Sequence, residues 1–219
     1  MGSPIYDWDG KLNTMGTVPE SYVNGPTETG RFVLWVQGCG LGCPNCFNPQ
    51  SWANKEKTLR DPIELAQEIL ASGKDGLTIS GGEPLSQPKA LLSLLQALHV
   101  DSNHEELRPE LARGIILFTG FDQAEMNEEQ LACLEYVDVS IQGRFIENSR
   151  VYDGLRGSSN QNILYKANKG RGVERLKLDL TRIDQAAEVH LGEDGGLQVT
   201  GFPDIDKETL KGLGVRVVG

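Results

Sequence analysis

Residues 31–48, RFVLWVQGCGLGCPNCFN, join a short apolar run to three closely spaced cysteines. We predict a buried strand at 31–37, because the run is apolar and is followed at once by glycine. The loop after it places Cys39, Cys43 and Cys46 at the spacing C-x3-C-x2-C. Its glycines let the backbone fold tightly, so three soft thiolates can surround one compact metal centre. The stretch therefore predicts a strand that leads into a metal-binding loop.

Two kinds of metal centre fit three local thiolates, and a coincidental cluster of cysteines is the remaining interpretation. A structural zinc ion normally takes four protein ligands, so it would need one from elsewhere in the chain. Cys133 is the other cysteine, but its place beside Leu131 and Leu134 on a predicted helix favours a small buried hydrophobic residue. A four-iron cube held by three thiolates instead leaves one iron open for chemistry. We favour the iron–sulfur cluster and keep zinc as the alternative.

Short apolar strands alternate with helices through the middle of the chain. Strands are predicted at 31–37, 77–80, 114–119 and 137–140, and helices between Asp61 and Gly73, at 89–98 and at 127–134. This alternation is typical of an α/β fold with a parallel sheet and crossover helices. Ligands bind such sheets at the carboxyl ends of the strands. The cysteine loop, Gly81-Gly82-Glu83 and Thr119-Gly120 all follow strand ends, which predicts one shared site.

The two ends of the chain show weaker patterns. We interpret residues 1–30 as an irregular N-terminal lead-in, residues 31–165 as the core, and residues 166–219 as a C-terminal extension of uncertain role. The extension is expected to be rich in β-structure, with antiparallel strands at 173–180, 186–191 and 197–200 and a short helix at 206–211. Residues 101–110 are polar and predict a surface loop.

Composition excludes several classes of protein. The 219 residues hold 31 acidic and 21 basic side chains, so the formal net charge is −10. Nucleic-acid binding through a broad basic face is not expected, because phosphate contacts need clustered lysine and arginine. No apolar run is long enough to span a membrane, and the first residues do not form a signal peptide. We expect a cytoplasmic protein with neither nucleic-acid nor membrane partners.

The motifs together resemble the radical S-adenosylmethionine (SAM) superfamily. The resemblance rests on C-x3-C-x2-C after the first strand and Gly81-Gly82-Glu83-Pro84 after the second. Asn45 before the third cysteine and Phe47-Asn48 after it resemble the activating enzymes of anaerobic ribonucleotide reductase. The segments 143–145 and 156–161 are also similar to that subgroup. The resemblance implies a partial (β/α)6 barrel of parallel strands with crossover helices, followed here by the short β-rich extension.

The resemblance also implies cofactors and the residues that hold them. Cys39, Cys43 and Cys46 would bind a 4Fe–4S cluster, and SAM would bind the open iron and be cleaved to a 5′-deoxyadenosyl radical. No catalytic residue is implied beyond the cluster and SAM. The residues expected to bind the cofactor are Phe47, Asn48, Ser80, Gly81, Gly82, Glu83, Thr119, Asp138 and Ser140. Those expected to face the substrate are Arg156, Ser158 and Asn160.

Several functions are compatible with this resemblance. The leading hypothesis is an activase that takes hydrogen from a glycine on a partner enzyme, with a reductant such as flavodoxin or ferredoxin. A splicease-like maturase of ribosomally made peptides, with a small accessory protein, is the second. A small-molecule radical SAM enzyme, similar to those that make purine precursors, is the third. A structural zinc module or a cluster carrier is the non-enzymatic alternative.

Overall fold

The computed structural model describes residues 4–99, 109–151, 154–166, 187–191, 197–201, 212 and 215–217. The strand predicted at 173–180, the whole helix predicted at 206–211, and most of the loop predicted at 101–110 lie outside these ranges. None of the helices in the described ranges combines the length and the apolar character that a membrane crossing requires.

A mixed seven-stranded sheet forms the centre of the molecule, in the order β3-β1-β2-β4-β5-β6-β7. Its strands are β1 (Leu12–Ser21), β2 (Arg31–Val36), β3 (Thr58–Arg60), β4 (Gly76–Gly81), β5 (Ile115–Thr119), β6 (Val139–Gln142) and β7 (Asn162–Tyr165). The four central strands β2, β4, β5 and β6 are parallel, whereas β1, β3 and β7 pair antiparallel at the two edges. The α/β prediction agrees with this sheet, and the complete (β/α)6 barrel stays a prediction.

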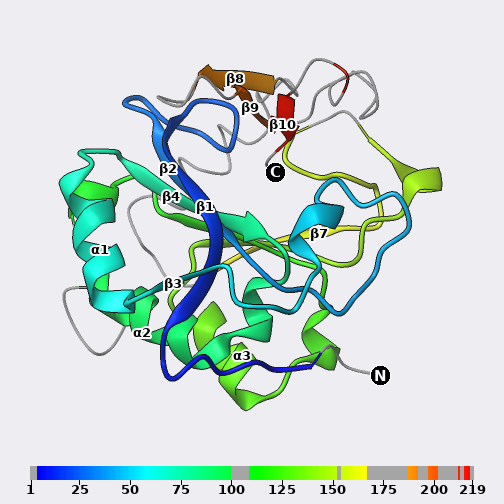
Figure 1. Cartoon of the computed structure of the whole chain (residues 1–219), viewed down its shortest axis with the longest axis horizontal. Helices are drawn as coiled ribbons and strands as arrows, with labels where there is room; N and C mark the ends of the chain where they lie inside the picture. Colours follow the sequence, from blue (N-terminus) through cyan, green and yellow to red (C-terminus); the bar gives the residue numbers. More distant parts are fainter. Residues whose placement is uncertain are drawn as a thin grey trace.

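Three helices cover one face of the parallel strands: α1 (Pro62–Ala71), α2 (Pro88–Ala97) and α3 (Glu128–Leu134) (Figure 1). α1 begins where predicted, because the Asp61 side chain accepts the Ile63 and Glu64 N–H groups and Pro62 has no N–H group that would need an acceptor. The helices and the sheet share one apolar core, which includes Leu34, Ile79, Leu117, Leu65 and Leu91. Short 3-10 helices at Pro49–Ser51, Pro84–Ser86, Pro109–Leu111, Gln123–Glu125 and Glu147–Ser149 lie in the connections.

The prediction of an irregular lead-in is wrong for residues 12–21, which form β1. The segment was hard to recognise because its burial does not alternate: Leu12 to Met15 are all buried. The register with β2 also shifts between Thr14 and Gly16 and again between Val18 and Ser21. Such bulges disturb the two-residue period on which strand prediction depends. β1 lies across the front of Figure 1, beside β2.

A second, three-stranded sheet lies in the C-terminal extension, in the order β10-β9-β8. Its strands are β8 (Ala187–Leu191), β9 (Leu197–Gly201) and β10 (Val215–Val217). β8 and β9 pair antiparallel, as predicted, whereas β10 pairs parallel with β9. The three strands group at the top of Figure 1, away from α2 and α3.

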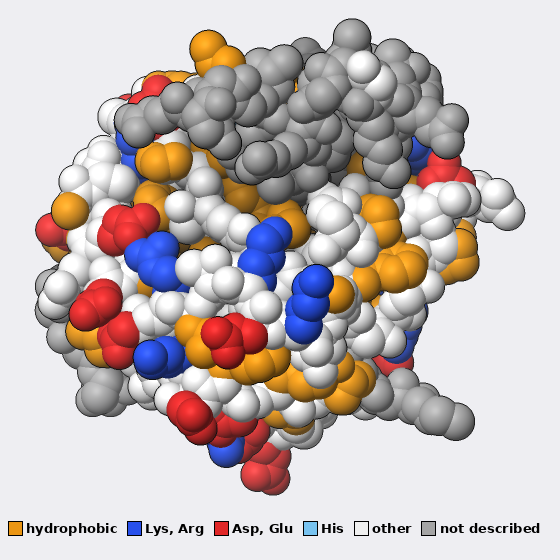
Figure 2. Space-filling view, in the orientation of Figure 1, with side chains coloured by type: hydrophobic (Ala, Val, Ile, Leu, Met, Phe, Trp, Pro, Cys, Tyr) orange, Lys and Arg blue, Asp and Glu red, His pale blue; other side chains and the backbone are white. Residues whose placement is uncertain are grey.

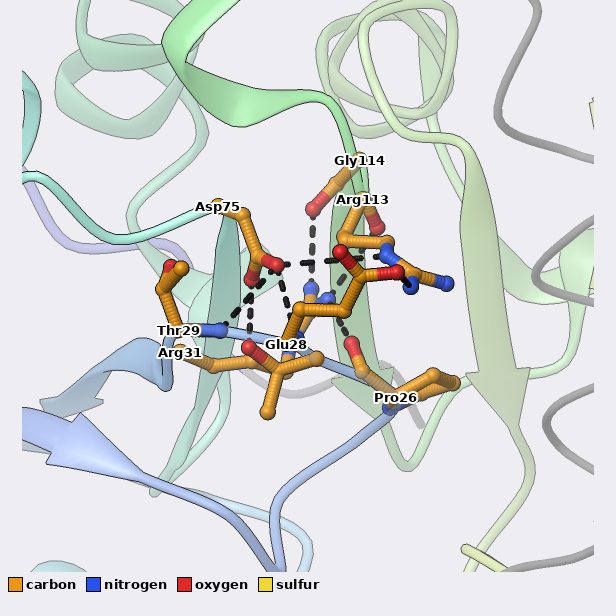
Figure 3. A network of polar contacts seen from close by, with 8 residues as sticks. Pro26, Glu28, Thr29, Arg31, Asp75, Arg113 and Gly114 are labelled. Atoms are coloured by element: carbon orange, nitrogen blue, oxygen red, sulfur yellow. Dashed lines mark hydrogen bonds and ion pairs between the residues drawn. The ribbon is translucent and has the colours of Figure 1, made fainter.

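A buried arginine network fixes the amino ends of the parallel strands (Figure 3). Arg31, the first residue of β2, is fully buried. Its N–H groups donate to the Thr78 hydroxyl and to the carbonyl oxygens of Pro26, Leu77, Arg113 and Gly114. Burial lowers the pKa of Arg31 to about 10, so it stays charged at neutral pH. The network joins β2, β4 and the start of β5 at the edge opposite the cysteine loop.

We predict that Arg31→Met lowers the free energy of unfolding by about 3–5 kcal/mol, because it leaves several buried carbonyl groups without a donor. Urea unfolding followed by circular dichroism measures the change. Arg60→Met is the matched control, since the Arg60–Glu68 ion pair is partly exposed and contributes only about 0–1 kcal/mol. Equal unfolding midpoints for the two variants would contradict the role given to Arg31.

Candidate iron–sulfur site

The three clustered cysteines lie on a tightly curled loop that starts at the carboxyl end of β2. Two residues of the loop have left-handed backbone, Gly42 with φ +60° and Asn45 with φ +56°. Asparagine is one of the few residues other than glycine that adopt this conformation readily. The three cysteines carry thiols rather than disulfides, and all three are partly exposed. The curled backbone thus presents three cysteines at one end of the sheet.

Each of the three sulfur atoms accepts a backbone N–H group. The Asn48 N–H donates to Cys46 Sγ at 3.3 Å. The Leu41 N–H group donates to the Cys39 sulfur, and the Phe145 N–H group donates to the Cys43 sulfur. Such hydrogen bonds orient metal-bound thiolates and tune the potential of iron–sulfur clusters. The donor set therefore fits a thiolate-ligated cluster.

The chemistry of these thiols also fits metal binding. Burial raises the pKa of Cys39 to about 12 and raises that of Cys43, so both are protonated in the metal-free protein. Metal binding would release these protons. Within the described ranges, no three His, Cys, Asp or Glu side chains converge on a single ion position. A four-iron cluster does not require its ligands to converge on one position, because each thiolate binds a different iron atom.

The Gly81-Gly82-Glu83 turn is joined to the start of the cysteine loop by backbone contacts. The Gly82 N–H donates to Val36 O at 2.9 Å, and the Glu83 N–H donates to Gly38 O at 2.9 Å. A Cβ atom on residue 82 would lie 2.3 Å from Gly38 O, and Gly81 has φ +107°. Both glycines are therefore needed for the close approach of the two segments.

The Glu83 carboxylate ties the end of β4 to the end of β5. It accepts the Thr119 hydroxyl and the Gly120 N–H, each at 2.8 Å, and the Leu85 N–H at 2.9 Å. Glu83 is 1% exposed, and burial raises its pKa to about 7. Glu83 and Thr119 were both predicted to bind the cofactor. In the structure they bind each other and so join two loops of the site, and their contact with a cofactor stays a prediction.

An aromatic cavity of about 100 Å³, open to solvent, lies beside the cysteine loop, on the sheet face opposite the helices. Its walls include Phe47 and Asn48 from the loop, Ser80 from β4, and Trp35 and Phe118 from β2 and β5. Phe145, Leu155, Gly157, Gln161, Asn24 and Gly201 complete the lining. The Phe47 and Phe145 rings pack at an interplanar angle of 59°, with centroids 4.9 Å apart, and the Arg150 guanidinium lies 4.8 Å from the Phe47 ring centroid.

Phe47, Asn48 and Ser80 thus line the cavity, whereas two other residues predicted to bind the cofactor do not. Asp138 lies before β6 and accepts the N–H group of Ile115, the first residue of β5. It is therefore at the amino ends of the strands, the wrong edge for a ligand. Ser140 is in register with the core residue Leu117, and its hydroxyl accepts from Gln142. Its side chain thus lies on the helix-covered face.

The residues predicted to face the substrate mainly shape the loop around the cavity. The Ser158 hydroxyl accepts the Ile146 N–H, and the Asn160 side chain donates to Arg144 O. Arg156 is partly buried and is absent from the cavity lining. Their neighbours Gly157 and Gln161 reach the cavity instead.

Trp35, Phe118 and Phe145 were missed as cavity residues, although strand alternation carries a signal for two of them. Trp35 is paired with Ser80 across β2 and β4, so the two share a face. Phe118 lies between the core-facing Leu117 and Thr119. Counting alternate residues back from the strand ends would have placed Trp35, Ser80 and Phe118 together. Phe145 lies on a loop and gives no such signal.

Comparison with known proteins places this chain among iron–sulfur proteins. The model of the 4Fe-4S single cluster domain family matches residues 23–164. A Haemophilus influenzae protein named anaerobic ribonucleoside-triphosphate reductase-activating protein is 33% identical over 162 residues, which are 68% of this chain and 96% of the relative. Proteins of the same name from Vibrio cholerae and Enterobacteria phage T4 are 34% and 33% identical. These matches cover 65% and 66% of this chain and 91% and 88% of the relatives.

We predict that Gly82→Ala reduces the iron bound per chain at least severalfold, because the new methyl group overlaps Gly38 O and displaces the start of the cysteine loop. Iron analysis after anaerobic reconstitution is the measurement. Gly16→Ala is the control, since a Cβ atom at residue 16 meets no atom within 4 Å. Unchanged iron content in Gly82→Ala would show that the close approach is not required.

A second prediction follows from the raised pKa of Glu83. The folded-state pKa of about 7 lies above the ordinary value of 4.5, so the fold favours the neutral carboxyl group. The resulting stabilisation is complete below pH 4.5 and is lost as the pH rises through 7. Between pH 4.5 and 8, the unfolding free energy should fall by on the order of 3 kcal/mol relative to Glu83→Gln, which does not titrate. Parallel pH profiles, measured in the same cluster state, would refute this assignment.

Proposed function

Because this chain belongs to the 4Fe-4S single cluster domain family, we propose that it is a radical SAM activase that generates a glycyl radical on an anaerobic ribonucleotide reductase. The observation that carries the proposal is the set of three cysteine thiols on one curled loop, each with a backbone N–H directed at its sulfur. Three thiolates complete the ligation of three irons of a cube and leave the fourth iron for a substrate. The names of the relatives support the choice of partner.

The cavity supports SAM as the second cofactor. It adjoins the cysteine loop through Phe47 and Asn48, and its aromatic walls offer flat surfaces for a purine ring. The Ser80 hydroxyl and the Asn48 amide supply hydrogen-bonding groups for ribose and amino-acid oxygen and nitrogen atoms. When bound together, the cluster and SAM supply a carbon radical that removes a hydrogen atom from the substrate.

The remaining residues of the site hold these parts in place. The Gly82 and Glu83 N–H groups fix the backbone before Cys39, and the Glu83 carboxylate fixes the Thr119-Gly120 turn beside it. The proposal also includes the (β/α)6 partial barrel, with β2, β4, β5 and β6 as its parallel core. An open barrel of this kind leaves room for a loop of the protein substrate. An external one-electron donor such as flavodoxin or ferredoxin would serve as the reductant.

The cluster is tested by comparing Cys43→Ala with Cys133→Ala. We expect Cys43→Ala to lose the four-iron cluster and reductant-dependent cleavage of SAM, because two thiolates do not hold the cube. Cys133 is buried in the helix-side core, with Pro88 O accepting from its thiol, so Cys133→Ala should keep both properties. A single zinc per chain in the anaerobically reconstituted protein would overturn the proposal.

The partner is tested by incubating the reconstituted protein with SAM, a reductant and an anaerobic ribonucleotide reductase. Electron paramagnetic resonance should show a carbon-centred radical on the reductase, with one methionine formed per SAM cleaved. The Cys43→Ala variant is the negative control. SAM cleavage without any radical on the reductase would retain the radical SAM chemistry and exclude this partner.

A further inference from the structure

β8 is an edge strand with an unusual distribution of side chains. It pairs with β9 on one side, and no strand of the described ranges pairs with its other side. An edge strand offers a row of backbone donors and acceptors to another chain. Native proteins commonly protect such edges with charged residues, a bulge or a covering segment.

The outward face of β8 is apolar, whereas its polar side chains point toward the rest of the protein. Val189 is 64% exposed and Leu191 is 74% exposed, and Ala187 on the same face is also exposed. Between them, the Glu188 carboxylate accepts the Tyr22 N–H at 2.6 Å, and His190 lies 3.4 Å from Glu188. The contact with Tyr22 identifies the inward face. On the other face Val189 is exposed, whereas Val199, its partner across β9, is 2% exposed, so the exposed apolar surface is confined to β8. Apolar side chains are visible at the top of Figure 2, where Figure 1 places β8.

The neighbouring strand β9 connects this edge to the cavity. Val199 and Thr200 are buried, and the Asn24 side chain donates to the Thr200 hydroxyl at 2.9 Å. Asn24 and Gly201, the last residue of β9, both line the cavity. A chain added to β8 would lie one strand spacing, about 4.8 Å, from the strand that ends at the cavity wall. Both strands lie beyond residue 164, the last residue that matches the family model.

We propose that β8 is a docking edge for an extended segment of the polypeptide substrate, which it holds by strand addition while another part of the substrate enters the cavity. This inference rests on the proposed function, because it assumes a polypeptide substrate. Backbone hydrogen bonds supply affinity in this mode, and alternate side chains supply specificity. The segment should carry an apolar residue at every second position, to cover Val189 and Leu191.

The intervening positions of the segment should be basic. The whole chain has a formal net charge of −10. Close to β8, the Glu20 carboxylate pairs with Lys74, and the Glu188 carboxylate lies 3.4 Å from His190, so both carboxylates already have partners. The net charge of the whole chain is therefore what would attract lysine or arginine, whereas an acidic segment would be repelled.

The first test uses a twelve-residue peptide of alternating valine and lysine as the probe, with the holoprotein. The double variant Val189→Ser/Leu191→Ser should weaken binding at least tenfold, because it removes the apolar contacts without adding charge. Ile63→Ser is the matched control, since Ile63 is 51% exposed on α1, and it should leave affinity unchanged. A peptide N-methylated along one edge should also lose binding at least tenfold, because the methyl groups block the strand hydrogen bonds.

The second test separates this inference from the proposed function. With the reductase, SAM and a reductant, the double variant should keep its iron content and its reductase-independent SAM cleavage, but yield at least fivefold less radical on the reductase. Full radical yield and unchanged peptide affinity would overturn the docking role while leaving the activase proposal intact. A wild-type dimer that the double variant converts to monomer, with peptide binding unaffected, would also overturn it and assign the face to a second copy.

Discussion

The close approach of two backbones, Gly82 against Gly38, is the constraint on which the site depends. The N–H groups of the turn after β4 donate to carbonyl groups at the end of β2, and no side chain fits between them. This contact fixes the residue that precedes Cys39. Leu41 then packs over Gly120, where a Cβ atom would lie 2.3 Å from the leucine side chain. Three strand ends are thereby held at fixed positions around the cysteines.

The parts of the fold encoded by local signals were predictable. The cap at Asp61, the strand at 31–37 and the free cysteine loop each depend on residues that are neighbours in sequence. Cys133 was also predicted correctly as a small buried residue, because its helix face is apolar. The parallel order of the central strands follows from the alternation of strands and helices, which requires crossover connections.

The features that the sequence did not predict have a common physical origin, because each depends on contacts that are distant in sequence. Asp138 and Thr119 both border short strands, yet one lies at the amino ends and the other at the carboxyl ends of the sheet. Ser140 and Ser80 both lie on parallel strands. The register places Ser140 on the helix-covered face with Leu117 and Ser80 on the cavity face with Trp35. Glu83 was expected to bind the cofactor, and the structure adds three protein donors to its carboxylate. Sequence spacing alone encodes neither the register nor these partners.

The Arg31 network gives the two rims of the sheet different tasks. At the amino ends, one buried guanidinium joins several segments of the chain by hydrogen bonds. The carboxyl ends instead carry glycine-rich loops and a cavity. Mutations that reshape the loops therefore leave the anchoring rim untouched. Over evolutionary time, such a division allows a lineage to drift toward new substrates while the scaffold beneath them persists.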